Sequence, residues 1–203
     1  GQIDIFQKTG QRKLPVLFDN EQTIHDSSSI IRHLEKIQTE QKLIPDNQKE
    51  GSQSQIIENW ADTTLAKSIK IVFLEEITKK PKLISSLLEN EIGDSMQMLY
   101  SKIPFNIASQ ISGLVNQKEK ECLKRNLEYL TNLIEKDKFI VGKELSIADI
   151  SVASQLSLLK FPNSSGEHLK GKGCSLYIND PSLENLFKWR DSIEDDLIKI
   201  SDV

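Results

Sequence analysis

Cysteine is scarce in this sequence. Its 203 residues include only Cys122 and Cys174, which lie far apart and form no CxxC pair. So few thiols argue against a disulfide-stapled secreted domain, because small extracellular folds depend on dense disulfides. We therefore expect a protein of a reducing compartment, the cytoplasm. Cys122 falls within an amphipathic helical pattern, where a cysteine usually behaves as a small buried hydrophobe.

Long apolar runs, an excess of basic charge and a glycine-rich phosphate loop are also missing. The apolar runs are too short for a signal peptide or a membrane span. A formal net charge of −4 argues against a nucleic-acid partner, which favours a basic surface. The lack of a phosphate loop argues against nucleotide chemistry. His25 and His33 have no third ligand in view, so we predict no metal site.

What remains is an ordinary globular composition, with 37% hydrophobic and 28% charged residues. Residues 16–18 and 23–25 predict two short strands around an Asp-Asn-Glu turn, because Asn and Asp tolerate the left-handed backbone of hairpin turns. Apolar residues then recur at helical spacing from Ser27 onward. The first 44 residues thus predict a small α/β domain, and the polar, turn-rich stretch 45–53 predicts a linker.

The rest of the chain, residues 54–203, has helical periodicity throughout. One long helix is expected to bury a face made of Ile57, Trp60, Ala61, Thr64, Leu65, Ile69 and Val72. Another is expected to bury Leu123, Leu127, Leu130 and Ile134, with Asn116 and Glu119 as its capping box. The predicted fold class is therefore α/β plus all-α, with the small first domain followed by an all-helical domain.

The stretch LSIADISVASQL carries the strongest local signal of the second half. Ser146 is a natural N-cap and Asp149 occupies the third helical position. The side chain of each can therefore accept the backbone N–H of the other. This is a structural capping box. It fixes where a core helix begins and has no catalytic role.

The stretch KLPVLFDNEQTIHDSSSIIRHLE, residues 13–35, has features of a peptide-binding site. Pro15 precedes a strand, and a cis bond before it would leave the backbone N–H and C=O of Leu14 free to pair with an extended peptide. Ser27 opens a helix whose amides can hold a carboxylate, while Asp26 attracts an ammonium group.

A ligand end with both charges on one carbon, an α-amino acid head, suits this arrangement. Lys13 could take a second carboxylate at the far end of the ligand. The alternative is that Asp-Ser is only a helix cap and that the proline only marks a turn.

Residues 13–35 resemble the glutathione-binding stretch of the glutathione S-transferase family. IIENWADTTL is similar to the first helix of the family's C-terminal domain, FIVGKELSIADISVASQL to its capping-box helix and NDPSLENLFKWRDSIE to its closing helices. LLKFPNSSGEHLKGKG is similar to a bacterial branch of the family. The resemblance implies a thioredoxin-like glutathione-binding domain over residues 1–44, followed by an all-helical C-terminal domain over 54–203.

The resemblance also implies roles for single residues. The backbone of Leu14 would pair with the cysteinyl unit of glutathione, and Pro15 would be the cis-proline. Asp26 and Ser27 would hold the γ-glutamyl head, and Lys13 could reach the glycyl carboxylate.

The sequence departs from the family pattern at three positions of this stretch and at its start. Asp26 stands where Glu or Gln is commoner, His33 replaces a usual Tyr and Ser29 a usual Ala. The resemblance begins around the family's second helix. We therefore expect this chain to lack the first β-α-β segment of a thioredoxin-like domain, and with it the catalytic Tyr, Ser or Cys, whose identity stays unknown.

The resemblance implies a glutathione transferase that conjugates the glutathione thiol to a small electrophile and forms a homodimer. By analogy, the wall of the electrophile pocket would include Trp60, Thr64, Met96, Met98 and Tyr100, although core packing is the alternative for each. A different possibility is a non-catalytic module of the same family used for protein association. A glutaredoxin-like thiol–disulfide enzyme is a third reading, but it needs a cysteine near the proline turn.

Overall fold

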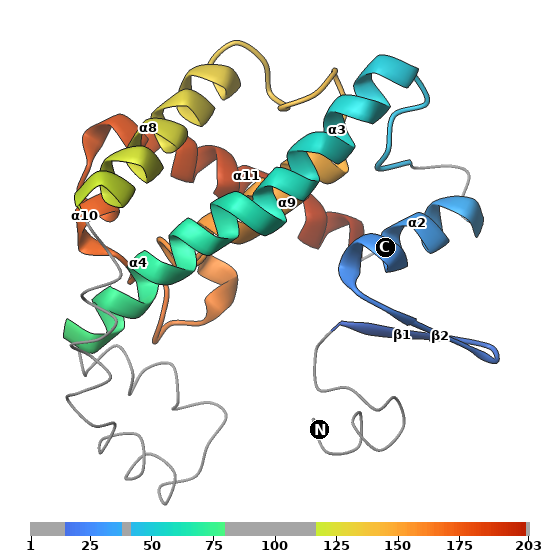
Figure 1. The fold of residues 1–203 in the computed structure, drawn as a ribbon, viewed down its shortest axis with the longest axis horizontal. Helices are drawn as coiled ribbons and strands as arrows, with labels where there is room; N and C mark the ends of the chain where they lie inside the picture. The colour runs from blue at the N-terminus through green and yellow to red at the C-terminus, as the bar shows by residue number, and fades with distance from the viewer. Residues whose placement is uncertain (1–14, 38–41, 80–116, 202–203) are drawn as a thin grey trace, which may run out of the picture. The chain divides into compact units, whose positions relative to one another are not determined.

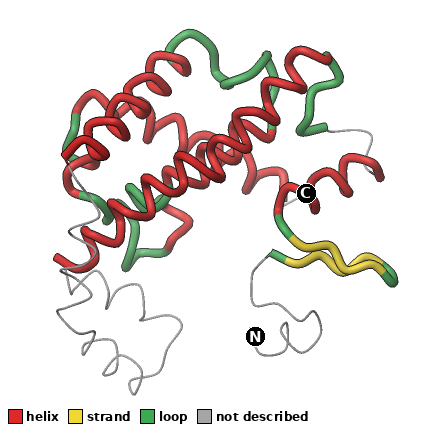
Figure 2. The backbone as a smooth tube through the Cα atoms, in the orientation of Figure 1, coloured by secondary structure: helices red, strands yellow, loops and turns green. Residues whose placement is uncertain are grey.

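The computed structural model describes residues 15–37, 42–79 and 117–201 (Figures 1 and 2). The chain divides into two compact units, Gly1–Asp46 and Asn47–Val203. In the described residues, the first unit holds a two-stranded sheet and one helix, and the second is built from helices. This confirms the predicted fold class of a small α/β part followed by a helical part.

The sheet of the first unit is an antiparallel hairpin. Strand β1 (Val16–Asp19) pairs with strand β2 (Gln22–His25), so that Val16 lies opposite His25 and Asp19 opposite Gln22. Asn20 has a φ of 53°, the left-handed conformation that tight turns need and that Asn tolerates. The predicted hairpin is confirmed, and each strand extends one residue further toward the turn.

Helix α2 (Ser27–Ile37) follows β2 directly and contacts both strands. His33 on α2 forms a 2.7 Å contact between its Nε2 and Oδ2 of Asp19 at the end of β1. This polar contact ties the helix to the turn end of the hairpin. The predicted helix that begins at Ser27 is thus present.

The second unit begins with helix α3 (Gln48–Trp60), part of which lies in the stretch predicted to be a linker. Asn47 has extended φ and ψ, and its side chain accepts the N–H groups of Lys49, at 3.0 Å, and Glu50, at 3.2 Å. An Asn N-cap of this kind starts a helix. Residues 48–53 of the predicted linker therefore belong to α3, and the boundary between the two units lies within the predicted stretch, after Asp46.

A π-helical turn, η1 (Ala61–Leu65), joins α3 to helix α4 (Ala66–Lys79), and the three form one long rod in Figure 1. Ala61 and Leu65 are buried, as predicted, but Thr64 is exposed. A π-turn holds more residues per turn than an α-turn, so the extra residues bulge outward. The prediction that Thr64 lies on the buried face is therefore wrong.

The remaining helices of the described residues are α8 (Gln117–Ile134), α9 (Ile147–Leu156), η2 (Asn163–Ser165), α10 (Ser175–Ile178), η3 (Pro181–Leu183) and α11 (Glu184–Ser201). Helix α9 contacts α3, η1, α4 and α11, whereas α8 contacts α4, α11 and η3. The core includes Leu65, Ile69, Leu127, Val152, Leu156, Leu159, Leu186 and Ile193. No helix in the described part of the chain is long and apolar enough to cross a membrane.

Helix α8 confirms one sequence prediction and corrects another. Leu123, Leu127 and Leu130 are buried, as the helical stripe predicts. Cys122 is exposed, although the sequence suggested a buried hydrophobe. The residue beside a buried stripe position points about 100° away from it, and here that direction faces solvent. Asn116, the predicted cap of this helix, lies outside the described residues.

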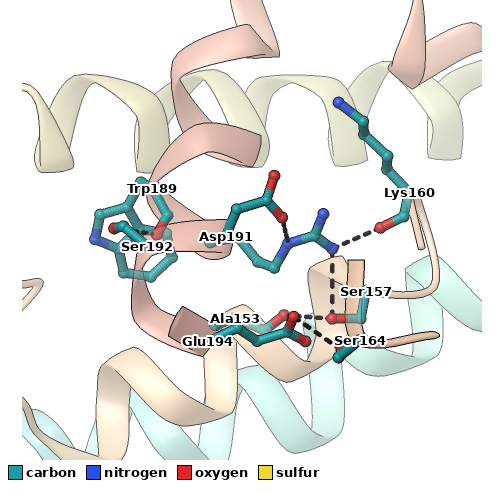
Figure 3. A network of polar contacts seen from close by, with 9 residues as sticks. Ala153, Ser157, Lys160, Ser164, Trp189, Asp191, Ser192 and Glu194 are labelled. Carbon is teal, nitrogen blue, oxygen red and sulfur yellow. Dashed lines mark hydrogen bonds and ion pairs between the residues drawn. The ribbon is translucent and has the colours of Figure 1, made fainter. Parts of the chain in front are cut away.

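A fully buried arginine, Arg190, connects α11 to the segment that follows α9. Its partners Asp191, Lys160 and Ser157 are labelled in Figure 3. Nε of Arg190 donates to Oδ1 of Asp191 at 2.7 Å, and its Nη1 donates to the carbonyl of Lys160 at 2.5 Å and to Oγ of Ser157 at 3.4 Å. Its guanidinium lies 5.9 Å from the ring centroid of Phe187. A buried charge needs such partners to offset its lost hydration, so this contact set fixes the backbone between α9 and α10.

Tyr177 on α10 gives a first testable prediction. Its hydroxyl is buried and has no hydrogen-bond partner in the part of the chain that the structure describes, and burial raises the pKa of this hydroxyl. An unsatisfied buried hydroxyl carries a desolvation cost. We expect Tyr177→Phe to leave the free energy of unfolding unchanged or to raise it by up to about 1 kcal/mol. Urea unfolding of the two proteins measures this; a loss of stability would show that the hydroxyl has a partner such as a buried water.

Candidate functional site

The pairing register of the hairpin brings two of the predicted binding residues to one end of the sheet. Because Val16 pairs with His25, Pro15 before β1 and Asp26 after β2 flank the same end of the ladder. The turn at Asn20 lies at the opposite end. Pro15 and Asp26 are both exposed. A ligand at this end could therefore meet the strand entry and the start of α2 together.

Asp26 has an unusual backbone conformation that marks the start of α2. Its φ is 73°, a left-handed value that is uncommon outside glycine and that often occurs at functional positions. Its carbonyl accepts the N–H of Ile30 at 3.0 Å, and Oδ2 of its carboxylate accepts both the N–H and the Oγ–H of Ser29 at 3.3 Å. Asp26 thus caps α2 while its side chain stays at the surface.

Ser27 is the first residue of α2 and is half-buried. The N-terminus of a helix carries a partial positive charge and favours an anion. The carboxylate of Asp26 stands one residue away and favours a cation. The two neighbouring residues can therefore bind groups of opposite charge, such as the ammonium and carboxylate groups of an α-amino acid head.

Ser29 is a contact that the sequence analysis did not assign to the site. It follows Asp26 by three residues, the spacing at which an N-cap side chain meets a backbone N–H in the first helical turn. That spacing was visible in the sequence as Asp-Ser-Ser-Ser. The left-handed φ of Asp26, in contrast, had no signal beyond the residue type.

Two of the predicted residues of the electrophile pocket, Trp60 and Thr64, are described, and both lie in the second unit. Trp60 is half-buried and packs against the core of the second unit, and Thr64 is exposed on η1. Met96 and Tyr100 lie outside the described residues, as does Met98. Lys13 and Leu14 of the predicted glutathione site also lie outside them.

The capping box predicted at the start of α9 is present. Asp149 is fully buried; its Oδ2 accepts the N–H of Ser146 at 2.9 Å and the Oγ–H of Ser146 at 2.7 Å, and its Oδ1 accepts the N–H of Ile140 at 2.7 Å. Burial raises the pKa of this carboxyl, and the hydrogen bonds oppose that rise. Every oxygen is engaged inside the fold, so this carboxylate is structural.

Candidate metal ligands do not cluster among the described residues. No group of three His, Cys, Asp or Glu side chains there could hold a metal ion. His33 is engaged by Asp19 at 2.7 Å at the turn end of the hairpin, away from Asp26.

Comparison with known proteins identifies both parts of the chain. The model of the glutathione S-transferase N-terminal domain matches residues 4–42, and that of the C-terminal domain matches residues 110–195. Together these matches cover well over half of the sequence, and they come in the order of the two units. No curated protein matches the sequence.

Two solved structures share the fold. A glutathione S-transferase from Rhodospirillum rubrum F11 is 20% identical, with a TM-score of 0.52 over 91% of this chain and 74% of that one. The β-etherase LigF from Sphingobium sp. strain SYK-6 is 18% identical, with a TM-score of 0.57 over 94% of this chain and 77% of that one. With both domain models matched in order on this fold, the chain belongs to the glutathione S-transferase family.

Proposed function

We propose that this protein binds reduced glutathione at the Pro15–Asp26 end of the hairpin and joins its thiol to a small electrophile. The observation that carries the proposal is the juxtaposition of Asp26 and the start of α2, next to the strand entry at Pro15. It offers a carboxylate and a helix N-terminus side by side. Family membership supports glutathione as the ligand.

Each part of glutathione has a proposed partner. The carboxylate of Asp26 receives the α-ammonium group of the γ-glutamyl head, and Ser27 receives its carboxylate. The backbone of Leu14, before a cis Pro15, pairs with the cysteinyl unit, and Lys13 meets the glycyl carboxylate. In the reaction, the glutathione sulfur loses its proton to solvent and forms a bond to the electrophilic carbon, whose leaving group departs with the bonding electrons.

The residue that stabilises the glutathione thiolate is not assigned. For the wall of the electrophile pocket, Trp60, Thr64, Met96 and Tyr100 stay proposals. Exposed Thr64 is the candidate among the two described residues, because Trp60 packs partly against the core.

Calorimetric titration with reduced glutathione tests the site. We expect Asp26→Ala to weaken binding about 10- to 100-fold, since a hydrogen bond to a charged group contributes roughly 1.5–3 kcal/mol. Ser27→Ala should weaken it less, because the backbone amides of the helix remain. Gln22→Ala, an exposed substitution at the turn end of the same hairpin, is the matched control and should bind as the wild type does. Equal affinities in all four proteins would place the ligand elsewhere.

An assay of turnover separates the enzyme from a non-catalytic interaction module. The purified chain is mixed with reduced glutathione and a general aromatic halide electrophile, and thioether formation is followed by absorbance. Turnover that falls in Asp26→Ala supports the transferase. Glutathione binding without turnover across several electrophile classes would favour the interaction module instead.

Family membership also supports a homodimer, which we propose as the working assembly. Light scattering coupled to gel filtration measures its mass directly. A mass of one chain at micromolar concentration would contradict this part of the proposal.

A further inference from the structure

The carboxylate of Asp26 is held by a second side chain, that of Ser29. Oδ2 of Asp26 accepts the N–H and the hydroxyl of Ser29, each at 3.3 Å. The backbone N–H contact is available to any residue except proline at this position, whereas the hydroxyl contact requires Ser or Thr. The hydroxyl thus adds a donor that the helix start alone does not supply.

The two contacts restrict the direction of the carboxylate. Asp26 is exposed and has a φ of 73°, and among the described residues its short side chain is held by Ser29. With Oδ2 engaged by two donors on the helix side, Oδ1 is the oxygen left to face a cationic group. A carboxylate that is already oriented loses less conformational entropy when it binds.

We infer that Ser29 is a positioning residue that orients the Asp26 carboxylate toward the α-ammonium group of the ligand and so sets selectivity for a free amino-acid head. This rests on the proposed binding of glutathione at Asp26 and Ser27. The inference adds a separate claim about Ser29: its hydroxyl acts only on the interaction with the ligand's amino group. Affinity for a ligand without that group does not depend on it.

The test compares two ligands: reduced glutathione and its desamino analogue, in which hydrogen replaces the α-amino group of the γ-glutamyl unit. Dissociation constants are measured for the wild-type chain, Ser29→Ala and Ser29→Thr. We expect Ser29→Ala to weaken glutathione binding about fivefold, the effect of one ordinary hydrogen bond, and to leave the affinity for the analogue unchanged. Ser29→Thr keeps the hydroxyl and should restore the wild-type preference.

The experiment distinguishes failure of the inference about Ser29 from failure of the proposed glutathione binding. If Ser29→Ala binds glutathione as the wild type does, or weakens both ligands equally, Ser29 only stabilises the helix start, and the inference is overturned while glutathione binding stands. If the wild-type chain binds neither ligand, the proposed function itself falls, and the role of Ser29 falls with it. Circular dichroism melting of Ser29→Ala establishes that the variant is folded in either case.

Discussion

Asp149→Ala is expected to lower the free energy of unfolding by about 4 kcal/mol, one of the two largest effects that we predict for this chain. The carboxylate of Asp149 is fully buried and accepts three hydrogen bonds, from the N–H and hydroxyl of Ser146 and from the N–H of Ile140. Alanine would leave two backbone N–H groups without an acceptor. Each unsatisfied buried donor costs roughly 1–3 kcal/mol, and the lost cap adds about 1 kcal/mol.

Urea unfolding followed by circular dichroism measures the loss. Asp62→Ala is the matched control, because the carboxylate of Asp62 is exposed and its contact among the described residues is a 3.2 Å hydrogen bond from Gln155. Its cost should stay below about 0.5 kcal/mol, as for most surface substitutions. Asp149→Asn keeps one acceptor oxygen and should fall between the two. Equal stability of Asp149→Ala and Asp62→Ala would contradict the structural role of the box.

Gly173→Ala is expected to destabilise the fold by about 3 kcal/mol or more, because it combines overpacking with backbone strain. Gly173 forms an isolated antiparallel bridge with Lys160, and its φ is 144°. A Cβ at this position would run into the carbonyl oxygen of Leu159 and lie 2.8 Å from the carbonyl carbon of the same residue. That carbonyl accepts the N–H of Cys174 at 2.8 Å. The added methyl group would therefore disturb the hydrogen bond that closes the 161–172 loop.

Gly171 is a matched control in the same loop. Its φ is 72°, but an added Cβ would meet no atom within 4 Å. Gly171→Ala should therefore cost only the left-handed strain, about 1–2 kcal/mol. Melting temperatures of the two variants give the comparison. If Gly171→Ala is as damaging as Gly173→Ala, backbone strain alone accounts for both, and the close approach of Leu159 is unimportant.

The sequence was most informative where a short pattern determines a local structure. The hairpin at residues 16–25 followed from strand propensity and turn residues, and α9 followed from the spacing of Ser146 and Asp149. The leucine stripe of α8 followed from helical periodicity. In each case the signal and the structure involve residues within a few positions of each other.

The errors arose where tertiary packing decides. A π-turn inside a long helix has no clear sequence pattern, so the exposure of Thr64 was missed. Whether Cys122 is buried or exposed depends on which face of α8 meets the core. Helical periodicity does not decide this for a position beside the leucine stripe. The polar, turn-rich stretch 45–53 suggested a linker, whereas the Asn47 cap starts a helix at Gln48 within it.

Part of the candidate site was predictable from the sequence, because it is formed by residues that are close together in the chain. Asp26 and Ser27 are neighbours in the chain, so their opposite charge preferences could be inferred from the sequence. The contact of Ser29 with Asp26 depends on the φ of Asp26, which propensity does not determine for a residue other than glycine. The electrophile pocket depends on side chains from distant segments, and no motif records such an arrangement.

The most direct test of glutathione binding is the melting temperature of the full chain at increasing concentrations of reduced glutathione. At a hundredfold excess over the dissociation constant, binding adds about 2.7 kcal/mol, which for a chain of this size is a rise of roughly 5–10 °C. We predict that rise for the wild type and its loss in Asp26→Ala. A wild-type melting temperature that stays constant up to saturating millimolar glutathione would contradict the account.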